Sequence, residues 1–133
     1  MNCNAQSALP PKPTPGELAI LQVLWRRGPS TVREVLEQLE QGTPTGYTTV
    51  LKLMQIMTEK GLIRRNEDHR THVYRPCRPE QDTQRQLVRD LLERAFGGSS
   101  KKLVLQALSA KKASRAELAE IRELLDQMEK DKS

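Results

Sequence analysis

Residues 47–65 read YTTVLKLMQIMTEKGLIRR, and this stretch decides the fold that we expect. Its apolar residues recur at helical spacing, which predicts a helix over about 47–60 with one face toward a core. Gly61 follows as a left-handed residue that ends this helix. The inward set is Val50, Leu53, Met54 and Met57. The outward set is Thr48, Thr49, Lys52, Gln55 and Glu59.

Two helices are expected before this stretch and a hairpin after it. The first helix begins after Gly16, and its apolar residues are Leu18, Leu21, Leu24 and Trp25. Thr31 and Glu34 have the spacing of a capping box for a second, short helix that ends near Gly42. Its buried stripe is Val32, Val35, Leu36 and Leu39, and a loop over residues 43–46 follows it. Residues 62–65 and 72–75 are short extended segments on either side of a polar turn, which predicts a β-hairpin.

Three short helices and a basic hairpin predict a mainly α fold, with a winged helix-turn-helix over residues 15–77. A helix fits the major groove of B-DNA, and arginines on a wing suit phosphates or a narrow minor groove. We therefore expect DNA contacts from the third helix and from the hairpin. The predicted helix residues are Tyr47, Thr48, Thr49, Lys52 and Gln55, and the predicted wing residues are Arg64, Arg65, Arg70 and Arg75. The alternative for the same pattern is a winged-helix module that binds another protein.

Residues 78–133 are helical in pattern and carry wide apolar stripes. Gly97–Gly98 separates a first helix from a second, and Ser114 with Glu117 has capping-box spacing before a third. Such short helices cannot bury these stripes within one chain, so we expect a two-fold dimer. The alternative is that they fold back on the winged domain. The predicted dimerisation residues are Leu87, Leu91, Leu92, Phe96, Leu103, Leu108, Leu118, Ile121, Leu125 and Met128.

The overall composition excludes several other classes of protein. The net charge is +5, which is consistent with a polyanionic partner. No apolar run of about 18 residues is present, so we expect no membrane insertion and a cytoplasmic location. Residues 1–14 are polar and proline-rich, which predicts a disordered tail rather than a signal peptide.

The reactive side chains do not form a catalytic or metal-binding constellation. Cys3 and Cys77 lie far apart in the sequence, which argues against a disulfide scaffold and a zinc site, and Cys77 reads as a small apolar filler. His69 and His72 could form a metal-binding pair, but no further ligand is placed to complete a site. We expect no enzyme activity, no cofactor and no bound metal, with a metal-responsive regulator as a less favoured alternative.

Four segments resemble the penicillinase and methicillin-resistance repressor family, which also includes copper-responsive members. They are residues 17–25 (ELAILQVLW), 47–50 (YTTV), 59–65 (EKGLIRR) and 96–105 (FGGSSKKLVL), and the likeness runs from about Pro15 to Lys130. The resemblance implies a homodimeric repressor that occupies inverted-repeat operators in double-stranded DNA. In the antibiotic-resistance branch, it also implies release through a membrane sensor-protease, which leads to cleavage within the dimerisation region.

The sequence departs from the family pattern in three places. Members that are cleaved carry an Asn-Phe pair, and Gln106 and Ala107 stand at the matching positions, which makes them a candidate cleavage region for a protease of different preference. The copper-responsive branch has a C-terminal Cys-x-Cys array, and no cysteine follows Cys77 here. Thr48 and Leu51 stand where members have a basic residue, and Lys52 supplies a positive charge nearby. The operator sequence, the regulated genes and the inducing signal do not follow from the sequence.

Overall fold

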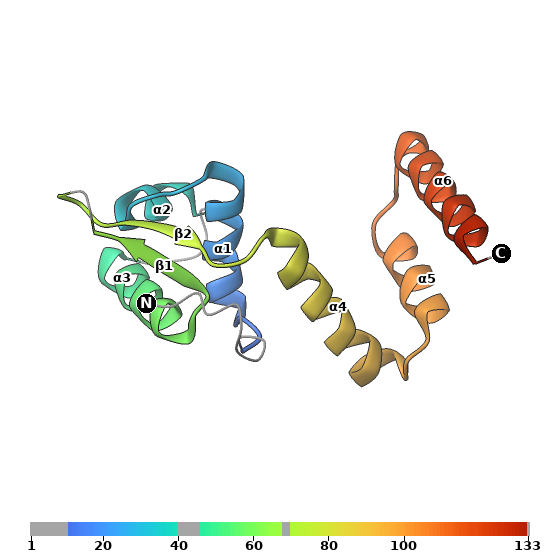
Figure 1. The fold of residues 1–133 in the computed structure, drawn as a ribbon, viewed down its shortest axis with the longest axis horizontal. Helices are drawn as coiled ribbons and strands as arrows, with labels where there is room; N and C mark the ends of the chain where they lie inside the picture. The colour runs from blue at the N-terminus through green and yellow to red at the C-terminus, as the bar shows by residue number, and fades with distance from the viewer. Residues whose placement is uncertain (1–10, 40–45, 68–69, 133) are drawn as a thin grey trace. The chain divides into compact units, whose positions relative to one another are not determined.

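The computed structural model describes residues 11–39, 46–67 and 70–132 of the chain. Its elements follow the order α1, α2, α3, β1, β2, α4, α5, α6 (Figure 1). The chain divides into two compact units, with the division between Val88 and Arg89 inside α4. Most of the predicted tail, most of the loop over 43–46, and residues Cys3 and His69 lie outside the described residues.

Helix α1 spans Pro15–Arg27 and begins two residues earlier than the sequence analysis expected. The expected start after Gly16 is wrong because Pro15 occupies the first helical turn. Backbone N–H groups in this turn have no partner within the helix, so the missing N–H of proline costs no hydrogen bond there. Thr14 caps the helix in a capping box with Glu17. The Glu17 backbone N–H donates to Thr14 Oγ1 at 3.2 Å, and the Thr14 N–H donates to Glu17 Oε1 at 2.9 Å.

Helix α2 spans Val32–Gln38, and the capping box predicted for Thr31 and Glu34 is confirmed. Its end was predicted near Gly42, which is wrong, because Leu39 already leaves the helix with extended backbone angles. Helix α3 spans Tyr47–Lys60 and follows Gly46, which caps it without a side-chain hydrogen bond. Gly61 ends α3 with a φ of 81°, in the left-handed conformation that the sequence predicted.

The hairpin consists of strands β1 (Ile63–Asn66) and β2 (Val73–Pro76), each one residue later than expected. The strands pair in antiparallel fashion with Arg64 opposite Arg75. Ser30 adds an isolated bridge to β2, since its N–H donates to the Tyr74 carbonyl at 3.0 Å and its carbonyl accepts from the Tyr74 N–H at 2.8 Å. This bridge ties the start of α2 to the wing, which we define as residues 63–76.

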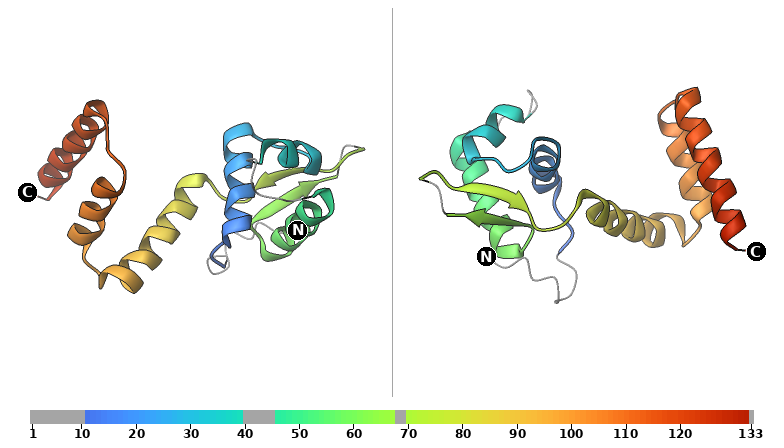
Figure 2. Two further views of the ribbon diagram at one scale, coloured as in Figure 1. Left: turned by 180° about the vertical axis from the view of Figure 1, so that it is seen from behind. Right: turned by 45° about the horizontal axis from the view of Figure 1, so that its top comes forward.

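The core of the winged unit lies between α1, α2, α3 and the hairpin. Strand β1 packs beside α3 and β2 beside α1, and Figure 2 shows this arrangement from two further sides. The predicted inward residues of α3 are buried except Leu53, which is half-buried against the same core. The buried apolar side chains are Ile20, Leu21, Val23, Leu24, Val32, Val35, Val50, Met54, Met57, Leu62, Ile63 and Tyr74. The prediction of a mainly α winged helix is confirmed.

One ion pair crosses the edge of this core and joins α1 to the end of α3. Lys60 Nζ lies 2.7 Å from Glu17 Oε2, and the Glu17 side chain is only 2% exposed, whereas that of Lys60 is 32% exposed. Burial disfavours the Glu17 carboxylate, but hydrogen bonds from Lys60 and Thr14 outweigh it and hold its pKa below the ordinary value. Glu17 therefore serves both as part of the cap of α1 and as a counter-ion for α3.

Three helices follow the wing: α4 (Glu80–Phe96), α5 (Ser100–Ala110) and α6 (Arg115–Asp131). The start of α4 belongs to the winged unit, where Thr83 is buried and the Trp25 indole N–H donates to the Arg78 carbonyl at 3.2 Å. Gly97 and Gly98 separate α4 from α5 with φ values of 57° and 80°, a conformation that favours glycine. Helices α5 and α6 contain no buried residue.

Two further observations concern Cys77 and the apolar segments. Cys77 is disulfide-bonded, so the interpretation of Cys77 as a small apolar filler is wrong. The argument from spacing against a disulfide also fails, because cysteines far apart in the sequence can meet in the fold. No helix in the described part of the chain is long and apolar enough to cross a membrane.

Candidate nucleic-acid interface

Helix α3 presents one face to the core and leaves the other in solvent. All five predicted contact residues of this helix are exposed: Tyr47, Thr48, Thr49, Lys52 and Gln55. They stand opposite Val50, Met54 and Met57, which are fully buried. Packing of the buried side fixes the orientation of α3 about its own axis. The polar side of its N-terminal half is therefore exposed to solvent.

The four predicted arginines of the wing differ in their surroundings. Arg64 and Arg70 are exposed, and Arg75, the strand partner of Arg64, is half-buried. None of these three forms an ion pair with another described residue. Residues directly opposite in an antiparallel pair share a face of the sheet, so Arg64 and Arg75 place two positive charges side by side.

Arg65 is engaged within the wing itself. Its guanidinium forms an ion pair with Glu67, and this hydrogen bond, with a smaller one to Tyr74, raises the pKa of Arg65 against the effect of burial. Its Nε atom is buried without a hydrogen-bond partner. A contact between Arg65 and a phosphate would compete with Glu67, although Arg65 lines the same pocket as Gln55 of α3.

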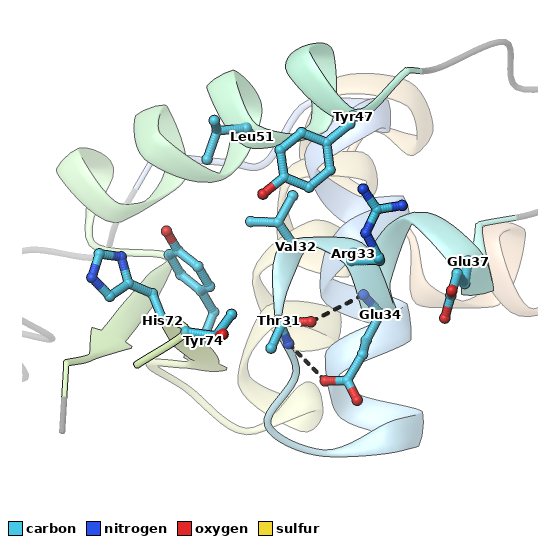
Figure 3. Close-up of a pocket in the computed structure, with 10 residues that line it drawn as sticks. Thr31, Val32, Arg33, Glu34, Glu37, Tyr47, Leu51, His72 and Tyr74 are labelled. Carbon is cyan, nitrogen blue, oxygen red and sulfur yellow. Dashed lines mark hydrogen bonds between the residues drawn. The ribbon is translucent and has the colours of Figure 1, made fainter. Parts of the chain in front are cut away.

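A groove of about 500 Å³ lies beside the start of α3 (Figure 3). Val32 and Leu51 provide apolar surface, and the Tyr47 hydroxyl points into the space between α3 and the hairpin. The remaining lining residues are Thr31, Arg33, Glu34, Glu37, Thr71, His72 and Tyr74. We call this space the α2–wing groove.

Glu34, one of the charged residues that α2 contributes to the groove, forms an ion pair. Glu34 Oε2 accepts from Arg27 Nη2 at 2.8 Å, and the Thr31 backbone N–H donates to Glu34 Oε1 at 2.9 Å. The bond from Thr31 and then that from Arg27 hold the pKa of Glu34 below its ordinary value. The guanidinium carbon of Arg33 lies 5.2 Å from the centroid of the Tyr47 ring, within cation–π range.

Arg33 and the other residues that α2 contributes to this groove were not predicted from the sequence as site residues. The relevant signal was weak: an arginine just after a capping box, and an aromatic residue at the first position of the next helix. Their contact depends on how α2 packs on α3, which spacing within one helix does not reveal. No group of three or more His, Cys, Asp or Glu side chains suited to a metal ion occurs among the described residues.

The predicted dimerisation residues lie on α4, α5 and α6, and none of them is fully buried. Leu91, Leu118, Leu125 and Met128 are exposed, whereas Leu87, Leu92, Phe96, Leu103, Leu108 and Ile121 are half-buried. Four further apolar residues of these helices, which were not among the predicted dimerisation residues, are exposed as well: Val88, Val104, Leu105 and Leu124. Gln106 and Ala107 lie in the middle of α5 and are exposed.

Helices α1, α2 and α3, followed by the two-stranded wing, define a winged helix-turn-helix protein, in which one face of α3 is exposed. The chain belongs to the penicillinase repressor family, whose pattern matches residues 13–127. This family is a family of repressors, in agreement with the resemblance found in the sequence.

Three relatives illustrate this similarity. A transcriptional regulator BlaI of Mycobacterium tuberculosis is 33% identical over 90 residues, which cover 67% of this chain and 65% of that protein. The penicillinase repressor of Bacillus licheniformis is 23% identical over 117 residues, which cover 88% of this chain and 91% of that protein. The methicillin resistance regulatory protein MecI of Staphylococcus aureus is 20% identical over 110 residues, covering 83% of this chain and 89% of that protein.

Proposed function

We propose that the protein is a transcriptional repressor that binds inverted-repeat operator DNA as a homodimer. The observation that carries this proposal is the exposed polar face of α3, on which Thr48, Thr49 and Lys52 lie opposite the buried core residues of the same helix. Short hydroxyl side chains such as Thr48 and Thr49 can meet base edges or thymine methyl groups in the major groove. The family membership and the printed names of the relatives support the same function.

Dimerisation through α4, α5 and α6 completes the proposal. Helices α5 and α6 contain no buried residue, and α5, with 11 residues, is short for a helix that would be stable alone in water. Pairing with a second copy would bury side chains such as Leu125, which is 52% exposed. A two-fold dimer would also bring two recognition helices to half-sites roughly 34 Å apart, one turn of B-DNA.

Release of the operator would follow a signal that weakens the dimer. The exposed Gln106–Ala107 segment of α5 is the candidate region for cleavage that depends on a membrane sensor-protease. Because a protease binds extended backbone, α5 would have to open locally before the bond is cut. Because α5 has no buried residue within the single chain, the free energy of this opening is set mainly by the contacts that α5 makes in the dimer.

The test is a titration of a labelled duplex that carries the region upstream of the protein's own gene, with a scrambled duplex as the control. Fluorescence anisotropy at two salt concentrations should give tight, salt-sensitive binding that prefers the native duplex, at two chains per duplex. Equal affinity for both duplexes would refute operator recognition. Absence of binding at either salt concentration would favour the protein-interaction alternative, which predicts partner binding that is insensitive to salt.

A further inference from the structure

The start of α3 is joined to α2 by a side-chain contact that sequence patterns did not indicate. Gly46 has no side chain with which to cap α3, so this end of the helix lacks a common local restraint. Arg33 instead reaches across from α2 to within 5.2 Å of the Tyr47 ring centroid. Figure 3 shows this guanidinium beside the ring at the rim of the α2–wing groove.

Tyr47 is positioned to touch a ligand. Its side chain is 42% exposed although it packs on Arg33, and its neighbours Thr48 and Thr49 on the same turn are exposed as well. A ring held in one orientation loses less rotamer freedom on binding than one that is free to rotate. We propose that Arg33 is a positioning residue that holds the Tyr47 ring for contact with base edges in the major groove.

This inference rests on the proposed DNA-binding function and adds a specific role for α2. The alternative role for Arg33 is a direct contact with a phosphate. The charges around it favour the positioning role: Glu34 is paired with Arg27, and Glu37 on the next turn of α2 lines the same groove. Together Arg33 and Glu37 contribute no net charge to the groove, so phosphate attraction at this place is weak.

The experiment compares full-length variants in the anisotropy titration described above. Arg33→Met removes the charge but keeps the length of the side chain, Arg33→Lys keeps a cation, and Tyr47→Leu removes the ring. A cation–π contact at an exposed site is worth enough to change affinity about two- to fivefold for each recognition helix. Because the dimer carries two recognition helices, we expect Arg33→Met to weaken binding to the native duplex about four- to twenty-five-fold in total, and to leave the scrambled duplex nearly unaffected.

Two further results are expected if Arg33 acts through Tyr47. The double variant Arg33→Met/Tyr47→Leu should bind no more weakly than Tyr47→Leu alone, because the ring that Arg33 positions is already absent. The salt dependence of Arg33→Met should equal that of the wild type, and Arg33→Lys should retain most of the affinity. Arg26→Met is the matched control, since Arg26 is exposed at the end of α1 and no described aromatic ring lies against it.

Several outcomes would overturn the inference. Additive losses in the double variant would show that Arg33 and Tyr47 act independently. A salt slope lower by about one in Arg33→Met would assign Arg33 to a phosphate. An equal loss in Arg26→Met would show a general effect of charge, whereas a wild type that binds neither duplex would refute the proposed function and the inference with it.

Discussion

Replacing Lys60 with methionine is expected to destabilise the winged unit in a way that depends on pH. The variant leaves the Glu17 carboxylate, which is 2% exposed, without its counter-ion at 2.7 Å. Removing one partner of a fully buried pair typically costs about 3–5 kcal/mol. Lys60 is 32% exposed, and Thr14 still donates to Glu17 in the variant, so we reduce this figure to about 2 kcal/mol at neutral pH.

The pH dependence follows from the direction of the pKa shift. In the wild type the pKa of Glu17 is held below its unfolded value of 4.5, so its contribution to stability is present above 4.5 and is lost as the pH falls through the lower, folded value. Without Lys60, its hydrogen bond and its charge no longer lower this pKa, so the pKa of Glu17 rises above its wild-type value. The carboxyl group of the variant can then be protonated at mildly acidic pH, so its deficit should shrink as the pH falls from 7 toward 4.

Urea unfolding followed by circular dichroism at several pH values measures both effects. Lys52→Met is the matched control because it makes the same change on the exposed face of α3, where its cost should be below about 0.5 kcal/mol. A deficit for Lys60→Met that stays constant between pH 7 and pH 4 would refute the reasoning. So would a deficit no larger than that of the control at pH 7.

Three further predictions concern DNA binding and assembly. Thr49→Ala or Lys52→Ala should weaken binding to the native duplex by about 1–3 kcal/mol if the residue reads a base, and equal losses on scrambled DNA in the titration would contradict that role. Arg70→Ala should weaken binding to all sequences alike and reduce the salt slope by about one, which the same titration tests at several salt concentrations. Leu125→Glu should lower the dimer fraction in sedimentation experiments and weaken operator binding through lost avidity, whereas an unchanged dimer fraction would remove α6 from the interface.

Features that depend on a single helix or strand could be predicted from the sequence. The helical spacing of Val50, Met54 and Met57 predicted α3 and, by exclusion, its exposed face, because one periodic pattern fixes both. Element ends were less well predicted. Pro15 was read as a residue that precedes the helix, although proline is favourable in a first turn, and Leu39 ended α2 before the glycine that was expected to do so.

Interactions between elements could not be predicted from the sequence. Glu17 and Lys60 are 43 residues apart, and their pairing depends on how α1 crosses the end of α3. Arg33 and Tyr47 likewise meet only through the packing of α2 on α3. Arg65 was predicted to contact DNA on charge alone, and its ion pair with Glu67 depends on the conformation of the wing.

The hydrogen bond between Trp25 and Arg78 provides the protein with a built-in optical probe. Trp25 is the single tryptophan of the chain, and its indole N–H meets the carbonyl of Arg78 just before α4 begins. Any event that separates the start of α4 from α1 would break this bond and admit water to the indole, which shifts its emission to longer wavelength. Unlabelled protein can therefore report, in real time, whether this junction stays closed when the chain meets DNA or a second copy of itself.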